Sequence, residues 1–326
     1  MKSKNRLWIF VAVAALSAAT MIADERTASA QEKQTLRIGV QGSLYLPAQS
    51  GYAFATDHGS YEKAGLDVQW TKTGTVADCA RAIAGGSLDA CTVEAFGAVN
   101  AVRAVPGLKV VGQLTTKDRH YLVANPSIKS IKDLANQKIG TGEPSSVQTL
   151  SGKQLVKALG GNPDDSTWVS IGATVAIIQS FANRQVAAAM VVNPFQLTVK
   201  DSVILGDTGQ STPTYQVLLA KPGTDPKVLE GLQRFMQVTL AETDYMINPA
   251  NEADIEAAWS KWVKVDPDVL KQIYKSYLDE NHWAGIKDSK FAINQAQWAD
   301  VVKLENPNLD APTYIDESLQ KAAFPS

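Results

Sequence analysis

The stretch VADCARAIAGGSLDACTV, residues 76–93, decides the fold class. Apolar residues recur at helical spacing over 76–84, and the pair Gly85-Gly86 then ends that pattern. Residues 90–93 form a short apolar run after this break, which is typical of a buried strand. A helix that is followed so soon by a buried strand indicates an α/β unit.

The same alternation continues on both sides of this unit. The pattern predicts further strands at 36–40, 66–70 and 108–112, and further helices at 52–63 and 99–105. It then restarts, with strands at 121–124, 138–140, 168–171, 187–192 and 215–220, helices at 131–134, 147–159 and 175–182, and a long helical tail. Strands and helices that alternate at these spacings predict mostly parallel sheets with helices on both faces.

A weak internal repeat favours two lobes. Residues 82–90 resemble residues 180–188, because each stretch is a helix end, a tight turn and a strand of small residues. A repeated α/β unit implies two similar lobes, and chance similarity of Ala-rich sequence is the alternative. The length of 326 residues allows more than one domain.

Composition and charge exclude several classes of protein. With 45% hydrophobic and 20% charged residues and only 2 Cys, the chain is neither disordered nor a small disulfide scaffold. A formal net charge of -2 without a basic block does not fit a nucleic-acid-binding protein. His58, His120 and His282 lack the spacing of a zinc site, and the common catalytic motifs are absent. We therefore expect no metal, no cofactor and no enzymatic activity.

The first thirty residues resemble a secretory signal peptide. Lys2, Lys4 and Arg6 precede an apolar run at 7–23, and the sequence Ala-Ser-Ala follows at 28–30. An uncleaved membrane anchor is the alternative, because the run approaches the length of a membrane span. The pattern predicts a periplasmic protein whose residues 1–30 are removed.

The two cysteines lie close in sequence within the predicted α/β unit. Cys79 belongs to the predicted helix and Cys91 to the strand that follows it. A helix that folds back on its own strand brings two such residues within bridging distance, and the export compartment is oxidising. A disulfide and two separate buried thiols both remain open at this point.

Several fragments, in their order, resemble a known family. These are LRIGVQ at 36–41, AGLDV at 64–68, AIAGGSLD at 82–89, SIKSIKDL at 127–134, KIG at 138–140 and NPF at 193–195. In this order and behind a signal peptide, the chain resembles the periplasmic solute-binding proteins of ABC importers. It is similar to the branch named for nitrate, sulfonate, taurine and bicarbonate, whose relatives bind pyrimidine precursors of thiamine.

The resemblance implies a two-lobed, type II-like periplasmic binding protein with a two-stranded hinge. Lobe 1 would comprise residues 31–122 and 216–326, and lobe 2 residues 123–215. The protein would be a monomer that captures a small polar organic solute, sulfonate-like, taurine-like or amine-bearing, for an ABC permease and its ATPase. An enzyme of thiamine-pyrimidine synthesis on the same fold, and a binding protein that serves a sensor, are the alternatives.

Ligands of open α/β sheets bind beyond the carboxyl ends of the strands, so the loops there supply the site candidates. In lobe 1 the candidates are Gly42, Ser43, Tyr45, Thr73, Gly74, Glu94, Thr115, Thr116 and Arg119. In lobe 2 they are Gly142, Ser145, Ser146, Asn193 and Phe195. Tyr45 at a half-buried rim, Thr73-Gly74 as a helix cap alone, and Phe195 in the core are the competing interpretations.

Glu94 departs from the expected pattern, because the resemblance implies a small uncharged residue at this strand end. A carboxylate in the cleft argues against a bare anion as the sole ligand and favours a ligand with an amine or another donor. The alternatives are that Glu94 faces solvent or pairs with Arg119, which would otherwise clamp an acidic ligand.

Overall fold

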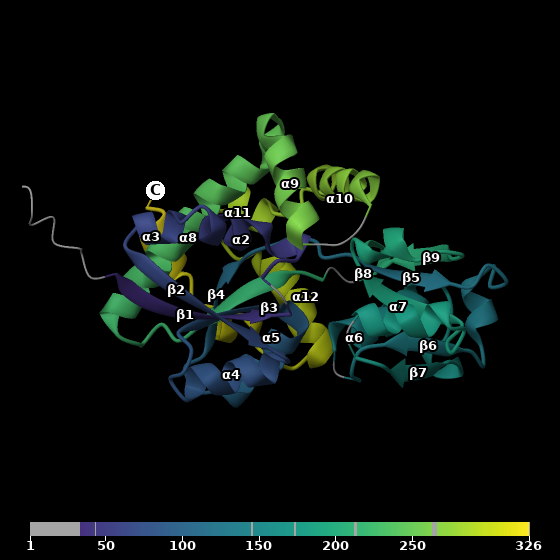
Figure 1. Cartoon of the computed structure of the whole chain (residues 1–326). Helices are drawn as coiled ribbons and strands as arrows, with labels where there is room; N and C mark the ends of the chain where they lie inside the picture. Colours follow the sequence, from purple (N-terminus) through teal and green to yellow (C-terminus); the bar gives the residue numbers. More distant parts are fainter. Residues whose placement is uncertain are drawn as a thin grey trace, which may run out of the picture.

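The computed structural model describes residues 33–42, 44–144, 146–172, 174–211, 214–262 and 266–325. The predicted signal peptide, Ser43 and Ser145 lie outside these ranges. Within these ranges, ten strands form two separate five-stranded sheets (Figure 1).

The first sheet has the strand order β2-β1-β3-β10-β4. Its strands are β1 (Gln34–Gln41), β2 (Leu66–Thr73), β3 (Ala90–Glu94), β4 (Lys109–Gln113) and β10 (Gln216–Ala220). β1 pairs in parallel with β2 and β3, whereas β10 lies antiparallel between β3 and β4. The carboxyl ends of β1 and β3 therefore lie at the same edge of the sheet.

The second sheet repeats this arrangement with the order β7-β6-β8-β5-β9. Its strands are β5 (His120–Ala124), β6 (Lys138–Thr141), β7 (Thr167–Ser170), β8 (Ala188–Val192) and β9 (Val203–Asp207). β6 is parallel to β7 and β8, and β5 is the antiparallel strand. Each sheet thus has one antiparallel strand, and the expectation of mostly parallel sheets flanked by helices is confirmed.

Helices cover both faces of each sheet (Figure 1). On the first sheet, α4 (Val76–Ala84), α5 (Ala95–Ala104) and α12 (Gln295–Glu305) share one apolar cluster, whereas α2 (Ser50–Asp57), α8 (Pro226–Ile247), α11 (Ala284–Lys287) and α13 (Ser318–Ala323) share the other. α9 (Glu252–Trp262) and α10 (Pro267–Asp279) form a further layer over α2, and α3 (Ser60–Lys63) precedes β2. On the second sheet, α6 (Val147–Ala158) and α7 (Thr174–Ala182) lie on opposite faces.

Two connections join the sheets. Residues 114–119 lead from β4 to β5, and the return from β9 to β10 is described over 208–211 and 214–215. Leu114 N donates to the carbonyl of Gln216 at 2.9 Å, and Asp118 N donates to the carbonyl of Thr214 at 2.6 Å. The two connections are therefore paired at these residues, in agreement with the two-stranded hinge that the family resemblance implies. No helix of the described ranges has the length and apolarity to cross a membrane.

The structure differs from the prediction in one strand and two helices. Strand β9 is missing from the prediction, since it is an edge strand that pairs only with β5 and carries a weak apolar pattern. The helix expected at 52–63 is two helices, because Gly59 lies between α2 and α3 with φ +63°. The helix expected at 99–105 begins at Ala95, directly after β3.

Cys79 and Cys91 form a disulfide between α4 and β3, which decides between the two open possibilities. Their Cα atoms are 6.3 Å apart, and both residues are fully buried. Replacing both residues with Ala should lower the free energy of unfolding by about 2–4 kcal/mol, because the unfolded chain loses a constraint on a short loop. Urea unfolding of the double variant tests this expectation, and unchanged stability would contradict it.

Candidate functional site

Buried polar side chains meet where the two sheets are joined. They come from α2, from the end of β3, from the crossing at 114–119, from β10 and α10, and from the loop after β8. We call them the interlobe polar cluster, which consists of the partly exposed Glu94, whose Oε2 is buried, and of the buried residues Tyr52, Thr115, Asp118, Asn193, Gln216, Tyr277 and His282. Buried polar groups normally find hydrogen-bond partners within a protein, so a cluster with several unpartnered atoms marks a functional site.

Glu94 lies at the carboxyl end of β3, in the position that precedes the first turn of α5. Its backbone N donates to Gln41 Oε1 at 3.2 Å, which ties it to the end of β1. Its Oε2 is buried without a hydrogen-bond partner among the described residues. Burial and then the charge of Asp118 raise the pKa of the Glu94 carboxyl well above its ordinary value.

Asp118 lies opposite, on the crossing from β4 to β5. The side chains of Thr115 and Gln216 hydrogen-bond to its carboxylate, whereas Oδ1 has no hydrogen-bond partner in the part of the chain that the structure describes. Burial raises the pKa of Asp118 to about 6, although these hydrogen bonds oppose the shift. Asp118, which is buried, and Glu94, whose Oε2 is buried, are therefore two acidic groups that disfavour each other's ionisation.

His282 faces Asp118 from the segment after α10. Its Nε2 is 3.6 Å from Asp118 Oδ1, and its Nδ1 is 3.0 Å from the carbonyl of Lys117. A carbonyl can only accept, so Nδ1 carries the proton and Nε2 presents a lone pair to the carboxylate. Burial lowers the pKa of His282 to about 3, which leaves two acceptors facing each other at neutral pH.

Asn193 brings the second lobe into the cluster. Its backbone N donates to the carbonyl of Arg119 at 2.8 Å, and its carbonyl accepts from the Tyr277 hydroxyl at 3.1 Å. Its Oδ1 accepts from Gln196 Nε2, whereas its Nδ2 has no partner among the described residues. Groups from both sheets therefore surround the same buried polar region.

Arg119 does not pair with Glu94, so that alternative for Glu94 is wrong. The guanidinium of Arg119 lies 3.3 Å from Asp207 Oδ1 and 3.5 Å from Glu280 Oε1. These partners belong to β9 of the second sheet and to the residue after α10. Arg119 thus links the two lobes and already has two carboxylate partners.

Arg119→Met should lower the free energy of unfolding at pH 7 by about 1–3 kcal/mol, because it leaves the partly buried Glu280 carboxylate without its cation. Burial raises the pKa of Glu280, and the charge of Arg119 opposes that shift. Without Arg119 the Glu280 carboxyl is more protonated at pH 5, so the loss of stability should be smaller there than at pH 7. Denaturant unfolding at both pH values measures this difference. Arg81→Met, which removes an exposed pair with Asp78, is the control, and an equal loss there would contradict the assignment.

The structure locates the other candidates of lobe 1 as follows. Gly42 has φ +87° directly after β1, a conformation that favours glycine. Tyr45 is 38% exposed, and its ring contacts Trp262 at a centroid distance of 5.2 Å. Thr73 is buried at the end of β2, and its Oγ1 has no partner among the described residues. Gly74 precedes the cap of α4, and the carbonyl of Thr116 accepts from Gln297 Nε2.

In lobe 2, Ser146 caps α6, because its Oγ accepts from Thr149 N at 3.3 Å. A Cβ at Gly142 would lie 2.6 Å from Ser146 Oγ, so a larger residue in the turn before α6 would displace the capping side chain of Ser146. Val147 and Leu150 of α6 pack against the apolar cluster of the first lobe, which places this helix start at the junction of the lobes. Phe195 is partly buried at the start of a 3-10 helix.

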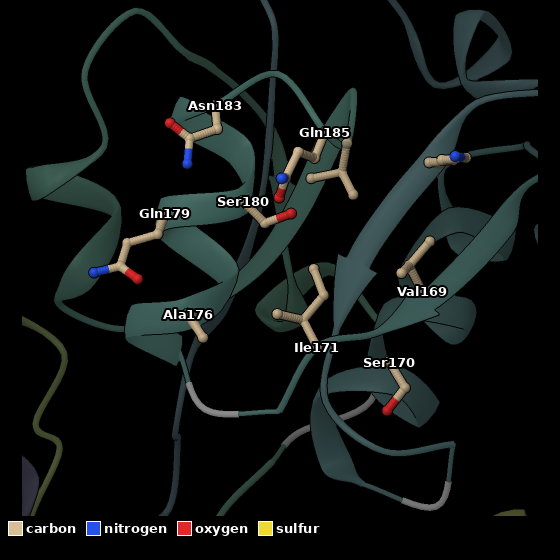
Figure 2. A pocket seen from close by; sticks show the side chains of 10 residues that line it. Val169, Ser170, Ile171, Ala176, Gln179, Ser180, Asn183 and Gln185 are labelled. Atoms are coloured by element: carbon tan, nitrogen blue, oxygen red, sulfur yellow. The ribbon is translucent and has the colours of Figure 1, made fainter.

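A separate cavity of about 640 Å³ lies within the second lobe, between α7 and the strands β6 and β7 (Figure 2). Figure 2 shows Gln179 and Ser180 on α7 and Ser170 and Ile171 at the end of β7. None of the predicted site residues that the structure describes lines this cavity. It is wide open to solvent and has no contact with the interlobe polar cluster.

Of the interlobe polar cluster, the sequence predicted Glu94, Thr115 and Asn193. It missed Tyr52, Asp118, Gln216, Tyr277 and His282. Asp118 could have been proposed from the sequence, because it lies between Lys117 and Arg119 in the predicted hinge. His282 had no such signal, because it joins the cluster only through packing of the helical tail. No group of three or more His, Cys, Asp or Glu in the described ranges is placed to hold a metal ion.

Comparison with known proteins agrees with this fold. The family model described as NMT1/THI5 like matches residues 47–253, and no curated protein matches the chain. The aliphatic sulphonate-binding protein SsuA from Escherichia coli has 17% identity and a TM-score of 0.67, over 88% of this chain and 99% of that one.

Two further structures show the same similarity. The alkanesulfonate-binding protein SsuA from Xanthomonas axonopodis pv. citri, bound to MOPS, has 16% identity and a TM-score of 0.64, over 90% of this chain and 98% of that one. The nitrate-binding protein NrtA from Synechocystis PCC 6803 has 13% identity and a TM-score of 0.67, over 90% and 88%. At these identities the similarity establishes the fold of periplasmic binding proteins.

Proposed function

Because the chain belongs to the NMT1/THI5-like family, we propose that it is the substrate-binding component of an ABC importer. In this proposal, lobe 1 (31–122 and 216–326) and lobe 2 (123–215) enclose a small polar organic solute and present it to a permease. Removal of residues 1–30 would deliver a monomer to the periplasm. The names of the structurally similar proteins support the transport role.

The interlobe polar cluster is the observation that carries this proposal. Asn193 from the loop after β8, Asp118 from the crossing between the sheets and Tyr277 from α10 come together around buried polar atoms that lack partners among the described residues. Unpartnered buried atoms reduce the stability of a protein, so their retention is explained by a ligand that contacts them. Closure of the lobes on that ligand would create the surface that the permease recognises.

A ligand should raise the melting temperature and make the protein more compact. Binding to the folded state alone stabilises it by about 2.7 kcal/mol at a hundredfold excess over Kd. A thermal-shift screen over sulfonates, amino-sulfonates, aromatic acids and pyrimidines finds the ligand, and small-angle scattering then measures the radius of gyration. A ligand that raises the melting temperature without any decrease in that radius would contradict closure.

The family name leaves an enzymatic role as the alternative. That role requires a catalytic group in contact with the ligand, and turnover would convert the ligand into a product. Recovery of the unchanged ligand after prolonged incubation supports a binding protein, whereas formation of a new compound supports the enzyme. Association with a sensor instead of a permease is distinguished by which membrane protein the ligand-bound form stimulates.

A further inference from the structure

We propose that the interlobe polar cluster binds the ammonium group of a small protonated amine, with Glu94 and Asp118 as its counter-charges. The inference rests on the proposed function, because the amine must enter between the lobes. Three acceptor atoms carry it, namely Glu94 Oε2, Asp118 Oδ1 and His282 Nε2. Each is buried and has no hydrogen-bond partner within the described ranges.

The charges in this region favour a cation. Glu94 forms no salt bridge with any described residue, and the only basic side chain that approaches the Asp118 carboxylate is His282. Arg119 follows Asp118 in the chain, but Asp207 and Glu280 hold its guanidinium. Two carboxylates near each other, with no lysine or arginine paired to either among the described residues and with only a buried histidine of lowered pKa beside Asp118, repel an anion and attract a positive charge.

The unpartnered atoms also require hydrogen-bond donors. His282 Nδ1 donates to the carbonyl of Lys117, so Nε2 is an acceptor that faces the acceptor Asp118 Oδ1 at 3.6 Å. A primary ammonium carries three N–H donors and satisfies such acceptors, whereas a quaternary ammonium carries none. The cluster therefore selects a protonated amine over a fully methylated cation.

Aromatic side chains limit the space around this charge. The Tyr277 ring lies 4.4 Å from the His282 ring and 5.2 Å from the Trp283 ring, measured between centroids. Tyr52 is buried on α2. Burial raises the pKa of its hydroxyl, and the charges of Tyr61 and Asp118 raise it further, so the hydroxyl lies within the influence of the same carboxylate. These rings exclude water and enclose a compact ammonium group.

Methylammonium chloride and tetramethylammonium chloride test the inference at equal concentration and pH 8. We expect methylammonium to raise the melting temperature of the wild type more than tetramethylammonium does. In Glu94→Gln and in Asp118→Asn, the apparent Kd for methylammonium should rise at least tenfold. Glu242→Gln is the matched control, because Glu242 is a partly buried carboxylate that already accepts from Ser60 and His58.

Equal stabilisation by the two cations, or full stabilisation by methylammonium in both site variants, would overturn the amine assignment. A parallel titration with hydroxyethanesulfonate separates this failure from failure of the proposed function. If that anion stabilises the protein and compacts the lobes while methylammonium does neither, the protein binds a solute but the amine assignment is wrong. Stabilisation by methylammonium that also depends on Glu94 and Asp118 supports it.

Discussion

Glu94→Gln should make the ligand-free protein more stable at pH 8, by about 1–3 kcal/mol, because it replaces a partly exposed carboxylate, whose Oε2 is buried without a hydrogen-bond partner among the described residues, with a neutral amide of the same shape. The same variant should lose most of its affinity for an amine ligand. A substitution that stabilises the fold and abolishes binding is the expected signature of a residue retained for function.

The pH dependence follows from the direction of the pKa shift. Because the pKa of Glu94 is raised in the folded protein, mainly by burial, folding favours its protonated form. The stability that this group contributes is therefore present below its ordinary pKa and is lost as the pH rises toward the folded value. Asp118, whose pKa burial raises to about 6, acts in the same direction between about pH 4 and pH 6.

Buried histidines act in the opposite direction and must be separated from Glu94. Burial lowers the pKa of His120 to about 4 and that of His282 to about 3, so these groups remove stability as the pH falls below about 6.5. The difference between wild type and Glu94→Gln cancels these contributions. Urea unfolding at pH 5 and pH 8 should show a gain for the variant that is larger at pH 8.

A loss of stability in Glu94→Gln at pH 8 would contradict this account of the cluster. The control Glu242→Gln should be less stable than the wild type, because its carboxylate accepts hydrogen bonds from Ser60 and His58. Opposite signs for Glu→Gln substitutions at two partly buried positions would show that the effect depends on the missing partner and not on the substitution itself.

Gly285→Ala should destabilise the protein by about 1–3 kcal/mol or more, because the added methyl group has no space. A Cβ at this position would lie 2.7 Å from the backbone C and O of Leu114 and 3.0 Å from the carbonyl of Gln113. Backbone atoms cannot rotate away as a side chain does, so α11 and the start of the crossing must separate. That crossing leads directly to Asp118.

The substitution should therefore also weaken ligand binding, because His282 and Asp118 lie on the two segments that separate. Gly223→Ala is the control, since a Cβ there would meet no atom within 4 Å. Thermal unfolding and ligand titration of both variants provide the comparison. A Gly285→Ala variant with the stability of the wild type would show that α11 does not fix the position of the crossing.

Most of the fold could be predicted from local patterns in the sequence. The strand at 90–93 and the helix at 76–84 were predicted well because their apolar periodicity, the Gly85-Gly86 break and the cap before Val76 all agree. Strand β9 was missed because an edge strand pairs on one side only and needs no strong apolar pattern. The break at Gly59 was missed, because the predicted helix was continued across a single glycine whose φ of +63° is visible only in the structure.

The candidate site could be predicted from the sequence only in part. Glu94 was predictable because a charged residue at the end of a buried strand is unusual in its local context. The facing pair of Asp118 and His282 was not, because the two residues are far apart in the chain and meet only when the helical tail packs on the crossing. The ion pair of Arg119 with Asp207 could not be predicted either, since Asp207 belongs to the missed strand β9.

Native mass spectrometry of the protein incubated with a complete metabolite extract tests the central claim most directly. The account predicts one small molecule per chain, which is released intact on denaturation and contains a protonated amine. Glu94→Gln should not retain it, whereas Glu242→Gln should. Absence of any bound solute on the wild type would contradict the solute-binding role, and retention of an anion without an amine by both variants would contradict the role of Glu94.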